Sequence, residues 1–206
     1  MKKSGLFSFL FILASALCSP ALFAATPLEQ IQATISKPDI LCGNFRQQKK
    51  LEGIKAPLVS EGRFCVHAEK GILWRHLKPF EQTLRVTGTE IVMMQGGRIT
   101  NRLDAREEPM VRMINNVLLA LVSGDIAPIE SLFDVDARIR DGSWNVSLRA
   151  KNAQLAKAIS EVFFDGREHV QNILIRRENG DETRIVLRDI KTGADAPDPD
   201  EAALYE

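Results

Sequence analysis

The sequence has few of the residues that build most catalytic and metal sites. Only three histidines, one tyrosine and three cysteines occur in 206 residues. His67, His76 and His169 do not form a metal-ligand spacing such as His-Glu-x-x-His, and no serine stands in a Gly-x-Ser-x-Gly elbow. A P-loop and a Gly-x-Gly-x-x-Gly fingerprint are also missing from the sequence. We therefore expect no enzyme, no metal and no cofactor, and we interpret each histidine as a solvated surface residue.

Long apolar runs are scarce as well, and the one at the N-terminus extends from Leu6 to about Leu17. Two lysines precede it, a proline follows it, and small residues then stand at Ala24 and Ala25. This three-part pattern is typical of a secretory signal peptide, and the run is too short to span a bilayer comfortably. We therefore expect residues 1–25 to be a signal peptide that is cleaved near Ala24 or Ala25 during export to the periplasm.

A surplus of either charge is also missing. The chain has 27 basic and 27 acidic residues, and cleavage removes only Lys2 and Lys3 from this balance. Such a chain has no general attraction for polyanions, so we expect no nucleic-acid partner. Residues 26–192 are the length of one domain with a sizeable core. The segment 193–206 holds five acidic residues and no basic ones, which predicts an acidic flexible tail.

Two cysteines remain after the signal peptide, Cys42 and Cys65. In an exported chain such a pair indicates one disulfide, and the alternative is two free buried thiols. Both cysteines alternate with aromatic residues, because Cys42 lies three positions before Phe45 and Cys65 directly follows Phe64. A hairpin that turns near residues 53–54 would bring the cysteines opposite each other. The bond would then join the first two strands on the face opposite the aromatic side chains.

Hydrophobic periodicity predicts mainly antiparallel β structure with a few helices. Thr26, Pro27 and Glu29 form a capping box before a short helix, and alternation of period two over 41–103 then predicts about six strands. Helical spacing follows over about 107–121, a short helix over about 125–131, and a second set of strands from about 132 to 190. Gly-Gly at 96–97 and Asn-Gly at 179–180 are hairpin signals. The order predicts an antiparallel sheet with helices grouped on one face.

Four of the five methionines suggest an adaptable apolar surface: Met93, Met94, Met110 and Met113. Methionine is flexible and polarizable and suits surfaces that accept ligands of variable shape, although core filling is the common alternative. The helical segment 110–121 carries few charges. It is either a permanent part of the core or a hinged cover over an apolar sheet.

Three stretches of the chain resemble the family of the periplasmic outer-membrane lipoprotein carrier LolA. They are GNFRQQK at 43–49, EGRFCV at 61–66 and GILWRHLKPFEQTLRVTG at 71–88. The family pattern is a Phe-x-Gln strand, a glycine-rich second strand, and a third strand with apolar-x-Trp before a proline. In this sequence these features are Phe45 with Gln47, Gly62, Ile72 with Trp74, and Pro79. The resemblance covers most of the mature chain and is strongest over 43–88.

The resemblance implies an unclosed β-barrel, which is a strongly curved antiparallel sheet whose concave face is covered by helices that act as a lid. The cavity between sheet and lid would hold the acyl chains of a lipoprotein or another lipid. A carrier of this kind, expected to be a monomer, would receive the cargo from an inner-membrane transporter or exporter. It would then pass the cargo to an outer-membrane acceptor. The predicted lipid-binding residues are Phe45, Phe64, Ile72, Trp74, Leu84, Val86 and Met93 on the sheet, and Met110, Met113, Val117 and Leu118 on the lid.

The sequence departs from the family in two places. Family carriers have an arginine in the turn between the second and third strands, but this turn is His-Ala-Glu-Lys at 67–70. The pair Cys42 and Cys65 is not a feature of the best-known carriers. These differences point to a divergent branch that is linked to glycolipid or aryl-polyene export. The alternative to carriage is an envelope-stress or export-system protein of the same fold that binds a protein partner. A lipid hydrolase is a third hypothesis, disfavoured by the missing nucleophile.

Overall fold

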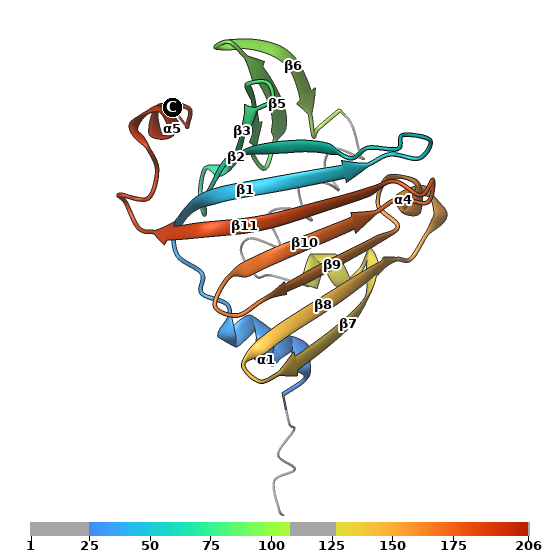
Figure 1. The fold of residues 1–206 in the computed structure, drawn as a ribbon. Coiled ribbons are helices and arrows are strands. Elements are labelled where there is room, and N and C mark those ends of the chain that lie inside the picture. The colour runs from blue at the N-terminus through green and yellow to red at the C-terminus, as the bar shows by residue number, and fades with distance from the viewer. Residues whose placement is uncertain (1–24, 108–126, 206) are drawn as a thin grey trace, which may run out of the picture.

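In the described residues, eleven strands form one antiparallel sheet, which makes up most of the molecule (Figure 1). The computed structural model describes residues 25–107 and 127–205, so nearly all of the predicted signal peptide lies outside them. The sheet is curved and unclosed, and its strand order is β6-β5-β4-β3-β2-β1-β11-β10-β9-β8-β7. Two meanders, β1–β6 and β7–β11, therefore meet where β1 pairs with β11. The predicted fold class, a mainly antiparallel unclosed barrel, is confirmed.

The strands of the first meander correspond closely to the predicted ones. They are β1 Ile40–Lys50, β2 Leu58–His67, β3 Gly71–Lys78, β4 Gln82–Val86, β5 Glu90–Gln95 and β6 Arg98–Asp104. Those of the second meander are β7 Phe133–Arg140, β8 Ser143–Ala150, β9 Glu161–Gly166, β10 Val170–Arg176 and β11 Glu182–Thr192. Both glycines of the 96–97 turn have positive φ, 55° and 73°, which is what a tight two-residue hairpin requires.

The described helices are short: α1 Pro27–Thr34, α3 Ala127–Glu130, α4 Ala153–Ala158 and α5 Pro199–Ala203. The predicted capping box starts α1, since the hydroxyl of Thr26 accepts from the amide of Glu29 and the Glu29 carboxylate accepts from the amide of Thr26. No helix in this part of the chain is long and apolar enough to cross a membrane.

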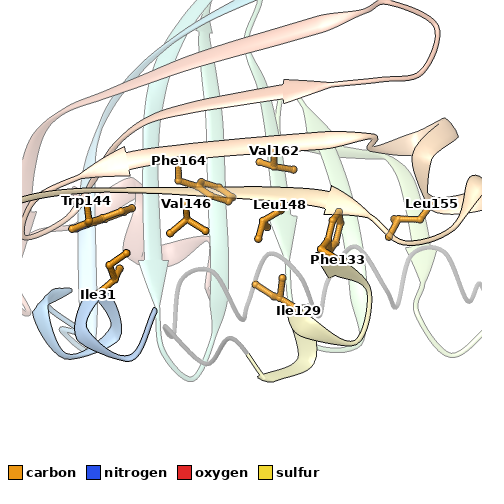
Figure 2. Close-up of a cluster of buried hydrophobic side chains, with 9 residues drawn as sticks. All are labelled: Ile31, Ile129, Phe133, Trp144, Val146, Leu148, Leu155, Val162 and Phe164. Atoms are coloured by element: carbon orange, nitrogen blue, oxygen red, sulfur yellow. The ribbon is translucent and has the colours of Figure 1, made fainter. Parts of the chain in front are cut away.

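The face of the sheet that carries Phe45 and Ile185, here called the inner face, holds two clusters of buried apolar side chains. The first lies on β7–β9 beneath α1 and α3 (Figure 2): Ile31, Ile129, Phe133, Trp144, Val146, Leu148, Leu155, Val162 and Phe164. The second lies on β1–β5 and β11: Phe45, Phe64, Val66, Ile72, Val86, Ile91, Ala105 and Ile185. Ile173 of β10 packs against both clusters, so the apolar surface continues across the seam between the two meanders.

The opposite face, here called the outer face, carries the predicted disulfide. Cys42 on β1 lies directly opposite Cys65 on β2, the two Cα atoms are 4.1 Å apart, and the sulfur atoms are bonded. The bond joins the first two strands, as the alternation of the cysteines with Phe45 and Phe64 predicts. Both cysteines are buried in a small third cluster that includes Leu73.

Removal of this disulfide is expected to lower the free energy of unfolding by about 3 kcal/mol, because the cross-link restricts the unfolded chain over 23 residues. The variant is Cys42→Ala with Cys65→Ala, and the measurement is urea unfolding under oxidising conditions. The wild-type protein unfolded in the presence of a reductant is the control, and it should lose a similar amount. Equal unfolding midpoints for the double variant and the oxidised wild type would contradict the prediction.

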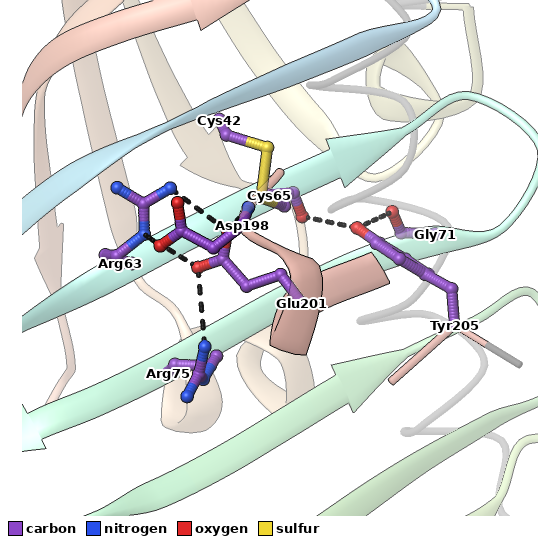
Figure 3. Close-up of a disulfide and its surroundings, with 8 residues drawn as sticks. All are labelled: Cys42, Arg63, Cys65, Gly71, Arg75, Asp198, Glu201 and Tyr205. Carbon is purple, nitrogen blue, oxygen red and sulfur yellow. Dashed lines mark hydrogen bonds and ion pairs between the residues drawn. A yellow bond between two sulfur atoms is a disulfide. The ribbon is translucent and has the colours of Figure 1, made fainter. Parts of the chain in front are cut away.

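The acidic end of the chain, residues 193–205, differs from the predicted flexible tail. It leaves β11 at Gly193, forms α5 and lies on the outer face beside β2 and β3 (Figure 3). Glu201 is only 1% exposed and Ala196 is 4% exposed. The acidic composition predicts solvation, but arginines on the neighbouring strands neutralise the carboxylates, and an acidic segment can then pack against a sheet.

Candidate functional site

The candidate site is the inner face of β1–β5, where the predicted sheet residues come together. Cross-strand pairing places Phe64 opposite Trp74, Trp74 opposite Leu84, and Leu84 opposite Met93. These four side chains form one row across β2–β5. The same pairing aligns a second row, which consists of Val66, Ile72, Val86 and Ile91. Six of the seven residues predicted on the sheet lie in these two rows.

Exposure differs between the two rows. Ile72 is 7% and Val86 is 1% exposed, so the second row is buried. In the first row Phe64 is buried, whereas Trp74, Leu84 and Met93 are half-buried. The first row is nearer to the turn between β3 and β4. Apolar side chains therefore become more accessible toward that turn, as expected of a surface that can meet a ligand from one end.

Aromatic side chains form the centre of the site. Phe45 and Trp74 stack with ring centroids 4.0 Å apart and ring planes 21° apart. Phe64, the cross-strand partner of Trp74, has its ring centroid 5.8 Å from that of Trp74. Phe45 lies over Gly62, its partner on β2, because a residue without a side chain leaves room for the ring. The stack gives a wide and rigid apolar wall with little conformational freedom to lose on binding.

His76 is a titratable group in contact with this wall. Its ring meets Phe45 edge to face, with centroids 5.2 Å apart. Burial lowers the pKa of His76 below its ordinary value. The imidazole is therefore neutral at neutral pH and adds no charge to the apolar surface. This position differs from the solvated surface residue that the sequence predicts, because alternation alone did not reveal the overlying ring of Phe45.

A cleft of about 360 Å³ opens beside Gly62 and Phe45, but its lining is of a different kind. Its other lining residues are Asn44, Arg46, Glu61, Leu77, Lys78, Arg188 and Asp189. Five of these seven are charged, so the cleft does not suit an acyl chain. We therefore assign the candidate site to the two apolar rows.

The structure adds residues to the site and leaves others untested. Val66 and Ile91 complete the second row, and Leu187 of β11 lies opposite Phe45. Alternation within β11 was visible in the sequence, but the pairing of β11 with β1 was not. The four predicted lid residues, Met110, Met113, Val117 and Leu118, lie outside the described residues, so the lid remains a prediction.

Potential metal ligands gather at one place in the described residues, on the outer face. The group comprises Cys42, Cys65 and Glu201. Both cysteine sulfurs are bonded in the disulfide, so Glu201 is the one residue of this group that could still bind a metal. One carboxylate that is already bound by arginine is a poor metal site.

Comparisons with known proteins identify a family and several similar solved structures. The model of a family described as outer membrane lipoprotein carrier protein LolA-like matches residues 21–204. No curated protein matches the chain. Similar solved structures include a LolA superfamily protein from Nitrosomonas europaea, with a TM-score of 0.45 and 11% identity over 82% of this chain and 92% of that one.

A DUF1329 family protein from Desulfovibrio piger is similar with a TM-score of 0.49 and 10% identity, over 87% of this chain and 94% of that one. The structure of the MucA/MucB complex of Pseudomonas aeruginosa is similar with a TM-score of 0.36 and 14% identity, over 84% of this chain and 58% of the matched chain. Because the family model covers nearly the whole chain, this protein belongs to the outer membrane lipoprotein carrier protein LolA-like family.

Proposed function

We propose that this protein is a periplasmic carrier that shields the acyl chains of a lipoprotein or another lipid against the inner face of its sheet. The observation that supports it most is the half-buried row of Trp74, Leu84 and Met93, continuous with the buried row beside it. Each buried methylene group contributes about 0.8 kcal/mol, so such a surface lets a lipid cross water between two membranes. Family membership supports the same function.

Carriage also defines the partners and the chemistry of the proposal. The carrier would act as a monomer, receive its cargo from an inner-membrane transporter or exporter and release it to an outer-membrane acceptor. Binding and release need no bond to be made or broken, so we propose that the protein is not an enzyme. A neutral His76 and an aromatic wall favour an apolar ligand over a charged one.

The two tryptophans provide a test because they lie in different clusters. Trp74 is half-buried in the candidate site, whereas Trp144 is 3% exposed on β8 and its indole N–H donates to the carbonyl of Arg167. The variant Trp144→Phe keeps Trp74 as the sole tryptophan, and Trp74→Phe keeps Trp144. A fatty acid brominated along its chain quenches indole fluorescence on contact. We expect strong, saturable quenching in Trp144→Phe and little in Trp74→Phe.

Equal quenching of the two variants, or none in either, would contradict a ligand site at Trp74. Native mass spectrometry with lipid extraction, on protein purified from its own periplasm, then identifies the cargo. Acylated protein supports lipoprotein carriage, and a glycolipid supports the divergent branch. A specific protein partner, without lipid and without quenching, would favour the interaction protein over the carrier.

A further inference from the structure

Residues 193–205 pack over the disulfide on the outer face. Cys42 is 1% exposed and Cys65 is not exposed at all. Ala196 packs in the same cluster, and Leu204 and Tyr205 pack against it. Three of the five apolar residues packed with the two cysteines thus belong to the C-terminal segment 193–205, and the other two, Ile40 and Leu73, lie on the sheet. The segment arrives from β11 at a glycine with a φ of +95°.

Glu201 is the anchor of this cover (Figure 3). Arg63 donates to both of its carboxylate oxygens, at 2.8 and 3.0 Å, and Arg75 lies 3.7 Å from one of them. The oxygen Oε2 also lies 3.2 Å from the sulfur of Cys65. Burial alone would raise the pKa of Glu201, but the hydrogen bonds from Arg63 hold it below its ordinary value. The carboxylate is therefore charged and lies between the sulfur and two cations.

Tyr205 provides a second anchor at the very end of the described chain. Its hydroxyl donates to the carbonyl of Cys65 at 2.9 Å and lies 3.4 Å from that of Gly71. Arg85 also donates to the carbonyl of Leu204, at 3.2 Å. These anchors are few, and all lie within a segment whose largest element is the five-residue helix α5. A short segment that is held by so few contacts can open locally at lower free energy than the whole protein unfolds.

Opening would change the chemistry at the sulfur atoms as well as their exposure. When the C-terminal segment leaves, it takes the carboxylates of Glu201 and Asp198 with it, and both of them pair with Arg63 in the closed state. Arg63 and Arg75 then remain on the sheet without these partners. Cations beside a cysteine stabilise the thiolate and make it a better leaving group. The closed state has the opposite arrangement, an anion against the sulfur.

We propose that Cys42–Cys65 is a thiol–disulfide exchange site and that the C-terminal segment is its gate. A dithiol is the reductant: one of its thiolates attacks a cysteine sulfur, the bond between Cys42 and Cys65 breaks, and the other cysteine leaves as a thiolate that takes a proton from water. The second thiol of the reductant attacks the mixed disulfide and releases the first cysteine. Two electrons pass to the protein, which ends with two thiols, and the reductant ends as a disulfide.

The test compares rates of reduction by dithiothreitol in four oxidised full-length proteins. They are the wild type, Glu201→Gln, Tyr205→Ala and the control Asp200→Asn. Asp200 is an exposed acid next to Glu201 on α5, so its variant removes the same charge without touching the anchor. Samples are quenched with an alkylating agent, and mass spectrometry follows the gain of two modified cysteines. Circular dichroism without denaturant confirms that each variant is folded.

We expect Glu201→Gln and Tyr205→Ala to be reduced at least about tenfold faster than the wild type, since tenfold corresponds to only about 1.4 kcal/mol of opening free energy. Asp200→Asn should match the wild type. The wild-type rate should change little in low urea, because local opening exposes little surface. If Glu201→Gln and Tyr205→Ala were both reduced at the same rate as the wild type, the proposal would be overturned. A wild-type rate that rises with urea as steeply as global unfolding would overturn it too. If Glu201→Gln does not fold, Tyr205→Ala decides the question.

Discussion

Replacement of Gly62 by alanine is expected to destabilise the protein by about 3 kcal/mol or more. A Cβ atom at this position would overlap the carbonyl oxygen of Arg75 on the neighbouring strand and would lie 2.9 Å from Cζ of Phe45. The first contact is with backbone, which cannot move aside without breaking the pairing of β2 with β3. The second is with the ring that stacks on Trp74, so the aromatic wall must shift as well.

Gly88→Ala is the matched control for this substitution. Gly88 lies in the turn between β4 and β5, and a Cβ atom there would meet no other atom within 4 Å. Its φ is not positive, so alanine is tolerated, and the change should stay within about 0.5 kcal/mol of the wild type or stabilise slightly. Urea unfolding of both variants gives the comparison. If Gly62→Ala unfolded at the same midpoint as Gly88→Ala, the close approach at Gly62 would not constrain the sheet.

Replacement of Phe133 by alanine is expected to cost about 4 kcal/mol. Phe133 starts β7, is 1% exposed, and lies in the inner-face cluster with Ile129 of α3 and Leu148 of β8 (Figure 2). Loss of the ring removes apolar contacts and leaves a cavity between the sheet and α3 that the surrounding side chains fill only partly. The variant should unfold at a lower urea midpoint, while the slope of the unfolding free energy against urea concentration stays unchanged.

Phe80→Ala makes the same chemical change at a position that is 77% exposed. It lies in the turn between β3 and β4, so its loss should change the free energy of unfolding by less than about 0.5 kcal/mol. A large effect at Phe80, or a small one at Phe133, would contradict the described packing. Because the two substitutions are identical, the difference between them measures burial and not residue type.

Local features of this fold could be predicted from the sequence because they depend on near neighbours. Alternation of period two placed Phe64 and Trp74 on one face and Cys65 on the other, and the register confirms both assignments. The capping box before α1 and the glycine turn at 96–97 follow from backbone chemistry that involves two to four residues. The disulfide could be predicted for the same reason, since its cysteines lie on consecutive strands.

Two features could not be predicted, because each depends on residues far apart in the chain. The pairing of β1 with β11 joins Phe45 to Leu187, and alternation within either strand does not specify its partner. The packing of the C-terminal segment depends on Glu201 meeting Arg63, which is 138 residues earlier. From composition alone, Glu201 and Arg63 would both be interpreted as ordinary surface charges. The same gap explains why Leu187 was absent from the predicted site.

The pairing of β1 with β11 joins the first and the last strand of the described residues. In a chain whose N-terminus emerges first, this pairing imposes an order on assembly. The hairpin of β1 and β2 is available early, whereas β11 and the segment beyond it come later. Cys42 and Cys65 can therefore meet an oxidant while their sulfur atoms are still open to solvent. The cover over them arrives only with residues 193–205. One edge of β1 also stays unpaired until β11 arrives. A long loop must close before these two strands can pair, and such closure slows the formation of the seam between the meanders.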